Sequence, residues 1–176
     1  MKLVVFALFA TALAFTMPHE IIRQFMDPTP PMLPDAWDAR MDYDPPQPSI
    51  ENLYYGVDYT NQMIGMNLTT SGMDMHIAID LAGNLQYTMY AYFGQWYCQS
   101  DDATGTEPIP QDILATATFV ETDDIGDHWN VGGDVDVWTE PDTGYPLKMT
   151  TDGQSVLFSE FTSKPEDGMF VIMDMC

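Results

Sequence analysis

The chain has 176 residues and a mass of 19.8 kDa, which suits one core-forming domain better than two. Hydrophobic residues make up 45% and aromatic residues 12%, and this composition excludes a disordered chain despite the charge. Acidic residues outnumber basic ones 27 to 5, so the net charge is -22. Binding to nucleic acid or to anionic membranes is excluded, because both need basic surfaces.

Residues 1–14 are predicted to form a secretory signal peptide. Lys2 precedes an apolar run at residues 3–15, and small residues spaced Ala-x-Ala follow within it. Cleavage is expected after Ala14, with Ala12 as the alternative. A buried core helix or a membrane anchor is the competing interpretation, but the run is too short to cross a bilayer about 30 Å thick. We therefore expect a secreted, extracellular or lumenal protein.

Export bears on the two cysteines, Cys98 and Cys176, because an oxidising compartment favours a disulfide bond between them. Two free buried thiols and an intermolecular bridge are the alternatives. An intramolecular disulfide is expected, and closing a loop of that size would stabilise the fold by roughly 4–5 kcal/mol in the chain-entropy model.

Residues 15–48 contain eight of the 13 prolines and are predicted to form an extended N-terminal arm. One short strand at residues 36–43 and a brief helix at residues 19–26 are expected inside it.

Residues 49–176 are predicted to form one antiparallel β domain. Apolar and polar residues alternate over 73–81 and again over 85–93, with a turn at Gly83-Asn84 between them, which is typical of a hairpin. The expected class is mainly β, with about eight to ten strands and few short helices, among them one turn at 110–114. Further strands are expected at 53–60, 62–69, 116–121, 131–138, 147–150 and 156–162.

No catalytic motif accompanies this pattern. The nearest approach to Gly-x-Ser-x-Gly is Gly153-Gln154-Ser155-Val156, which lacks the second glycine. A pair of carboxylates does not indicate a glycosidase site here, because some pair is inevitable in a chain with 27 acidic residues. We expect a protein that is not an enzyme.

Calcium is the cation that suits so much carboxylate. Asp123, Asp124 and Asp127 share a predicted turn, and Asp134 and Asp136 share one face of a predicted strand, so these five are the candidate ligands. No EF-hand loop is present, and a solvated acidic surface is the alternative. The Met73-x-Met75-His76 segment resembles a copper site, but on a strand His76 faces away from the methionines, which favours packing.

Asn67-Leu68-Thr69 is an acceptor sequence for N-glycosylation, provided that the chain is exported through a glycosylating pathway.

Several short segments, in order, resemble the ependymin-related family. Trp138 and the DTGYPLK segment at 142–148 match its "W-x-D-x-x-T-G-x-P-x-R/K" pattern, and Phe170 and Cys176 match "F-x-x-x-x-C" near the end. Upstream, LPDAWDA at 33–39, YYGVD at 54–58 and Tyr97-Cys98 match earlier family positions. This chain departs from the family in having only two cysteines and little length for covering helices.

The resemblance implies a curved antiparallel sheet or half-barrel, similar to bacterial lipoprotein carriers, that encloses an apolar cavity. Family members are secreted, often glycosylated and dimeric, and are linked to calcium, extracellular matrix and lipid-like ligands. A secreted binding protein for a hydrophobic small molecule or lipid is therefore expected. The alternatives are that its apolar faces form only a filled core, that it is a calcium-binding matrix or adhesion protein, or, least favoured, a secreted hydrolase. The expected cavity lining is Met73, Met75, Ile77, Ile79, Tyr87, Met89, Ala91 and Phe93.

Overall fold

The computed structural model describes residues 27–174 and 176, and this part of the chain contains strands and no helix. The alternation of apolar and polar residues explains several strands, such as Met73–Asp80, whereas the strand at Gln95–Asp102 is exposed along nearly its whole length. The strands are β1 (Ala36–Asp44), β2 (Ile50–Asp58), β3 (Met63–Thr70), β4 (Met73–Asp80), β5 (Leu85–Tyr92), β6 (Gln95–Asp102), β7 (Thr118–Thr122), β8 (Asp127–Gly132), β9 (Val135–Thr139), β10 (Pro146–Thr151) and β11 (Gln154–Thr162).

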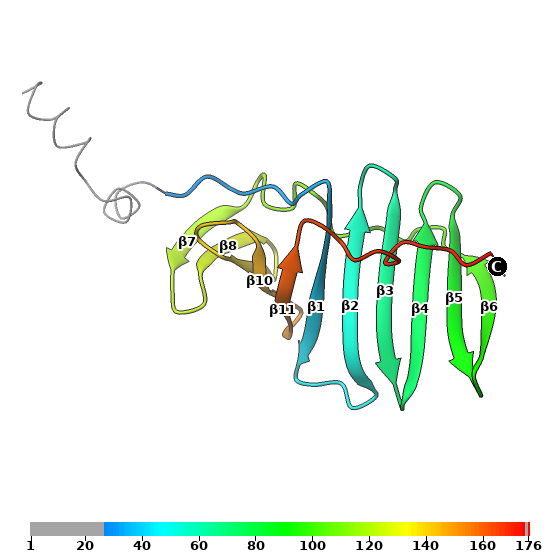
Figure 1. Cartoon of the computed structure of the whole chain (residues 1–176). Coiled ribbons are helices and arrows are strands. Elements are labelled where there is room, and N and C mark those ends of the chain that lie inside the picture. The colour runs from blue at the N-terminus through cyan, green and yellow to red at the C-terminus, as the bar shows by residue number, and fades with distance from the viewer. Residues whose placement is uncertain (1–26, 175) are drawn as a thin grey trace, which may run out of the picture.

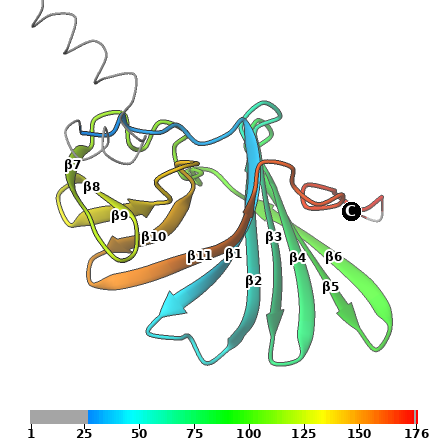
Figure 2. The same cartoon turned by 60° about the vertical axis from the view of Figure 1, so that its left-hand side comes forward.

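All eleven strands form one antiparallel sheet in the order β6-β5-β4-β3-β2-β1-β11-β10-β9-β8-β7 (Figure 1). Among the described strands, every two consecutive ones pair except β6 and β7, and the pair of β1 and β11 joins the two series. Strands β6 and β7 lie at opposite edges of the sheet, so residues 103–117 must cross the sheet to join them. The sheet is strongly curved, and the strands fan out around this connection (Figure 2).

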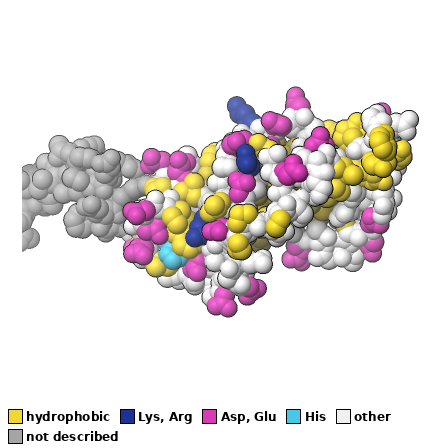
Figure 3. All heavy atoms as spheres, turned by 90° about the horizontal axis from the view of Figure 1, so that it is seen from below, with side chains coloured by type: hydrophobic (Ala, Val, Ile, Leu, Met, Phe, Trp, Pro, Cys, Tyr) yellow, Lys and Arg dark blue, Asp and Glu magenta, His cyan; other side chains and the backbone are white. Residues whose placement is uncertain are grey.

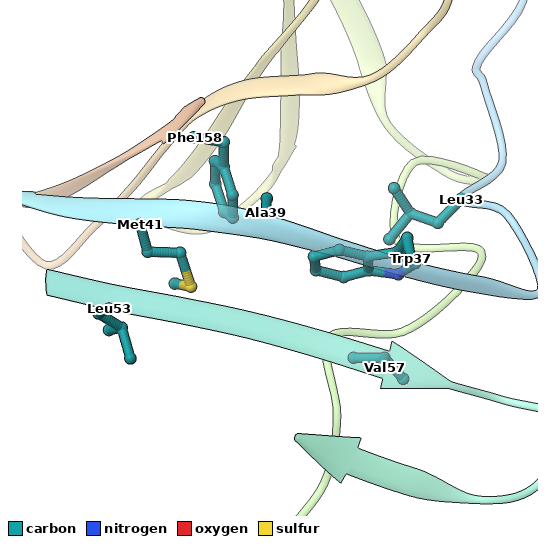
Figure 4. Packing of buried hydrophobic residues seen from close by; sticks show 7 residues of the cluster. All are labelled: Leu33, Trp37, Ala39, Met41, Leu53, Val57 and Phe158. Atoms are coloured by element: carbon teal, nitrogen blue, oxygen red, sulfur yellow. The ribbon is translucent and has the colours of Figure 1, made fainter. Parts of the chain in front are cut away.

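The main core lies on the face that residues 103–117 cross, which we call the inner face. Trp37 of β1 is fully buried there, and its indole Nε1 donates to Tyr59 Oη at 3.4 Å, while that hydroxyl donates to the Ile109 carbonyl at 2.6 Å. These contacts fix the crossing connection to the sheet. The side chains of the central cluster converge from β1, β2, β11 and the arm (Figure 4). They are Leu33, Trp37, Ala39, Met41, Leu53, Val57 and Phe158.

The opposite face is crossed by the C-terminal segment, residues 163–174 and 176, which we call the tail; we call this side of the sheet the tail face (Figure 1). The tail runs from β11 across β1 to β6, where Cys176 is bonded to Cys98 with an S–S distance of 2.02 Å. Met169 is buried at mid-tail over the paired residues Gly56 and Gly65. A Cβ on Gly65 would lie 2.0 Å from the Met169 carbonyl oxygen, so only glycine lets the tail approach the sheet this closely.

The fold class and the disulfide agree with the expectations from the sequence, and the strand count exceeds the expected range by one. The strand expected at 131–138 is two strands, because Gly132 and Gly133 adopt positive φ angles and turn the chain between β8 and β9. Strand β6 was not expected, since residues 95–102 show no apolar alternation. The helical turn expected at 110–114 is a series of hydrogen-bonded turns.

Two expectations concern the N-terminal part of the chain. The short strand expected in the proline-rich arm is β1, which pairs with both β2 and β11 in the middle of the sheet. The predicted signal peptide and the helix at 19–26 lie outside the described residues. Within the described part, no helix is long and apolar enough to cross a membrane.

Candidate ligand cleft

The residues expected to line an apolar cavity are divided between the two faces of the sheet. Met75 pairs with Tyr90 and His76 pairs with Met89 across β4 and β5. Met75, Ile77 and Ile79 therefore lie on the inner face, whereas Tyr87, Met89 and Ala91 lie on the tail face with His76. Phe93 belongs to neither set, because it lies in the turn after β5 and is 90% exposed.

One apolar pocket in the core of the inner face is too small to hold a ligand of lipid size. The apolar pocket between Trp37, Ile109 and Leu114 has a volume of about 20 Å³, which is room for roughly one water molecule. In the described part of the chain, these apolar side chains form a packed core at this position.

A larger hollow lies on the tail face, and we call it the cleft. Its volume is about 460 Å³, within the range of small-molecule sites. Strands β2, β3 and β4 form the floor, while Trp96 of β6 and Glu166 of the tail contribute to the walls. The polar and aromatic residues that line it are Asn52, Tyr54, Asn67, Thr69, Asp74, His76, Trp96 and Glu166. Leu68 and Met75 also border it, although as a pair they belong to the inner face.

His76 connects the floor of the cleft to the tail. Its Nε2 lies 3.0 Å from the Val171 carbonyl oxygen and its Nδ1 lies 2.5 Å from the Asn67 side-chain oxygen. The carbonyl can only accept, so in the neutral ring Nε2 donates and Nδ1 accepts, which requires Asn67 to turn its amide NH₂ toward the ring. Burial lowers the pKa of His76, and the bond to Val171 opposes this effect. The His76 ring is therefore uncharged near neutral pH.

One side of the cleft is shaped by a β-bulge. The register between β1 and β11 shifts beside Glu160, whose φ of 54° is unusual for a residue with a side chain. The bulge aims the Glu160 carboxylate at Tyr54, whose hydroxyl donates to Glu160 Oε2 at 2.9 Å. This hydrogen bond raises the pKa of Tyr54 and orients its ring at the cleft.

The sequon residue Asn67 lies in this cleft, with its side chain held by His76. A glycan attached to Asn67 would occupy the space in front of Asn52 and Trp96. Glycosylation of Asn67 stays a prediction, and it is incompatible with a ligand in the same cleft.

The five aspartates proposed as calcium ligands are not gathered in one place. Asp127 is buried and accepts a hydrogen bond from Thr122 Oγ1 at 2.7 Å. Asp136 accepts from His128 Nε2 and from Asn130 Nδ2, both at 3.0 Å, and these bonds lower its pKa. Asp124 and Asp134 are exposed in turns, so Asp134 does not share a strand with Asp136 as expected.

Asp123 belongs to a different group, which was not predicted from the sequence. Ligand atoms of Glu121, Asp123 and His128 lie within 4.8 Å of one another. Asp123 already accepts bonds from two backbone amides and from Trp138 Nε1 at 2.8 Å, and the bond to Trp138 is the main reason that its pKa is lowered. A cation here would have to replace existing hydrogen bonds, and the histidine suits a transition metal better than calcium.

No protein-family model matches this chain, and no curated protein matches it. The resemblance to the ependymin-related family therefore stays a prediction.

Proposed function

We propose that this chain is a non-enzymatic binding protein of an extracellular or lumenal compartment, and that its ligand occupies the cleft on the tail face. The observation that supports this most strongly is the cleft itself, a hollow of about 460 Å³ bordered by a covalently attached tail. The disulfide is compatible with an extracellular or lumenal location.

The residues around the cleft favour a small organic cation. Asp74 and Glu166 contribute carboxylates, and no Lys or Arg is among the residues that line the hollow. Trp96 is 42% exposed and presents an aromatic surface on which an ammonium group can rest. Asn52 can hydrogen-bond a hydroxyl group on the same ligand, and Thr69 Oγ1, which donates to Asp74 Oδ1 at 2.9 Å, can accept from one. The net charge of -22 also raises the local concentration of cations around the protein.

Calorimetric titration with choline tests this proposal. Choline should bind, and its uncharged analogue, in which carbon replaces nitrogen, should bind more weakly because it loses the attraction to Asp74 and Glu166. Replacing Trp96 by alanine should weaken choline binding about fivefold to thirtyfold, as expected for loss of a cation–π contact worth about 1–2 kcal/mol. Trp138→Phe is the control, because Trp138 lies on β9, away from the cleft.

Two results would overturn the proposal. One is the absence of choline binding to the native protein. The other is binding that neither Trp96→Ala nor Asp74→Asn weakens, which would locate the site elsewhere.

A lipid-like ligand, homodimerisation and binding to calcium or matrix components stay predictions from the resemblance. The packed pocket of about 20 Å³ means that a lipid would have to bind outside that part of the core.

A further inference from the structure

Three hairpins of this sheet have the same two-residue turn, and one of them contains an unexpected residue. The turns are Ser71-Gly72, Phe93-Gly94 and Asp152-Gly153, with φ angles of 51° and 73°, 49° and 74°, and 50° and 77°. Two positive φ angles define the type I′ turn, whose first position favours Asn, Asp or Gly. Serine and aspartate are short and polar, whereas a bulky phenylalanine at positive φ is an outlier. Turn formation does not explain Phe93.

Phe93 is also the most exposed of the large hydrophobic residues in the described part, at 90%. Tyr92 packs against it edge to face with ring centroids 4.4 Å apart, and Tyr90 stacks on Tyr97 at 5.6 Å. We call Tyr90, Tyr92, Phe93 and Tyr97 the aromatic tip. Hydrophobic side chains gather at the end of the molecule where the β5–β6 hairpin lies (Figure 3). The tip is therefore a preformed apolar projection held in shape by its own ring contacts.

The charge around the tip restricts what it can contact. Residues 90–97 contain no Asp, Glu, Lys or Arg, the nearby carboxylate of Asp74 lies on the cleft side with Trp96, and no Lys or Arg occurs between Arg40 and Lys148. An anionic membrane would be repelled by a protein with a net charge of -22, and so would a second copy of this chain. A zwitterionic phospholipid surface carries no net charge, and tyrosine rings are well suited to its interface because they combine an apolar body with a polar hydroxyl.

We propose that the aromatic tip inserts into surfaces of zwitterionic phospholipid, with Phe93 entering the apolar layer and the tyrosines at the headgroup level. This function is separate from ligand binding in the cleft and does not depend on it. The tip projects from the edge of the sheet, so it can reach a lipid surface without any change in the fold.

Sedimentation with phosphatidylcholine vesicles tests the proposal. The protein is purified from a secreting host, and its mass is measured to check that the predicted signal peptide has been removed. This check is needed because the apolar run at 3–15 would itself enter lipid. The native protein should sediment with the vesicles. Phe93→Asn should bind about 10- to 100-fold more weakly, since it loses the burial of one large apolar side chain. Its melting temperature should be equal or higher, because asparagine suits the turn better than phenylalanine.

Ser71→Asn is the matched control, because it makes the same type of substitution at the same turn position of the β3–β4 hairpin and should leave vesicle binding unchanged. Adding phosphatidylserine to the vesicles should weaken binding of the native protein.

The proposal is overturned if the native protein does not bind phosphatidylcholine or if Phe93→Asn binds as well as the native protein does. It is also overturned if ultracentrifugation without lipid shows a native oligomer that Phe93→Asn dissociates, with no vesicle binding. That result would assign the tip to self-association, in which the tip of one molecule could enter, for instance, the hollow of about 270 Å³ beside Pro45 and Pro46 of another.

Discussion

His76 is a buried residue through which pH can act on this fold. It is buried between β4 and the tail, and its pKa lies below the ordinary value of 6.5 because burial disfavours the charged ring. The unfolded chain therefore takes up a proton at a higher pH than the folded chain does. Stability from this group is fully present above pH 6.5 and is lost as the pH falls toward the lowered pKa.

We expect the free energy of unfolding to decrease on acidification from about pH 7 to about pH 5, with a contribution from His76 of up to about 1.4 kcal/mol per pH unit. His76→Gln keeps a donor for the Val171 carbonyl but cannot become charged, so its dependence on pH should be shallower. Urea unfolding of both proteins across this range measures the difference. Parallel curves for the native protein and the variant would contradict this role of His76.

At the scale of structural elements, the tail is the segment whose position depends most on single residues of the sheet. Met169 lies on Gly65 so closely that an added Cβ would contact its carbonyl oxygen, while Glu166 N donates to Asp38 Oδ2 at 2.9 Å. Burial raises the pKa of Asp38, and the bond from Glu166 opposes this effect. The disulfide tethers the far end of the tail, so a clash at Gly65 should loosen its middle without releasing it.

Gly65→Ala should therefore destabilise the protein by about 1–3 kcal/mol, as overpacking does, although replacing glycine in a strand normally stabilises. Hydrogen exchange should increase in residues 166–173, while the amides between β3 and β4 stay protected and serve as the internal control. A more stable variant with an unchanged tail would show that the close approach is not maintained in solution.

At the scale of the whole molecule, charge repulsion should limit stability. Eighteen acidic residues lie between Arg40 and Lys148 without one Lys or Arg among them. Raising the salt concentration from 0.01 M to 0.1 M shortens the Debye length from about 30 Å to about 10 Å, which should relieve much of this repulsion. We expect the melting temperature to rise with sodium chloride.

Calcium at matched ionic strength separates general screening from a specific site. An additional rise would support the calcium alternative, because a ligand that binds only the folded state stabilises it. If the additional rise comes from the group of Glu121, Asp123 and His128, Asp123→Asn removes it, and Asp134→Asn, at an exposed turn, is the control. A melting temperature indifferent to both salts would contradict the dependence on cations.

The sequence alone was sufficient for the properties that depend on local pattern. Alternation of apolar and polar residues located most strands, because a strand exposes one face and buries the other. The two cysteines and the leader-like N-terminus led to the expected disulfide, since only one intramolecular pairing exists. Strand β6 was missed because neither face of residues 95–102 is consistently apolar, and it lies at the edge of the sheet.

Only the tertiary structure decided which residues of neighbouring strands lie on the same face of the sheet. Asp80 pairs with Leu85, so four residues connect β4 to β5 and the even-numbered residues of one strand lie beside the odd-numbered residues of the other. If only three residues connected the strands, so that Asp80 paired with Asn84, Met75 and Met89 would lie on the same face, as expected from the sequence. The cleft depends on the same long-range geometry, because Trp96 and Glu166 reach it from β6 and from the tail. No local pattern marks those residues as neighbours of His76.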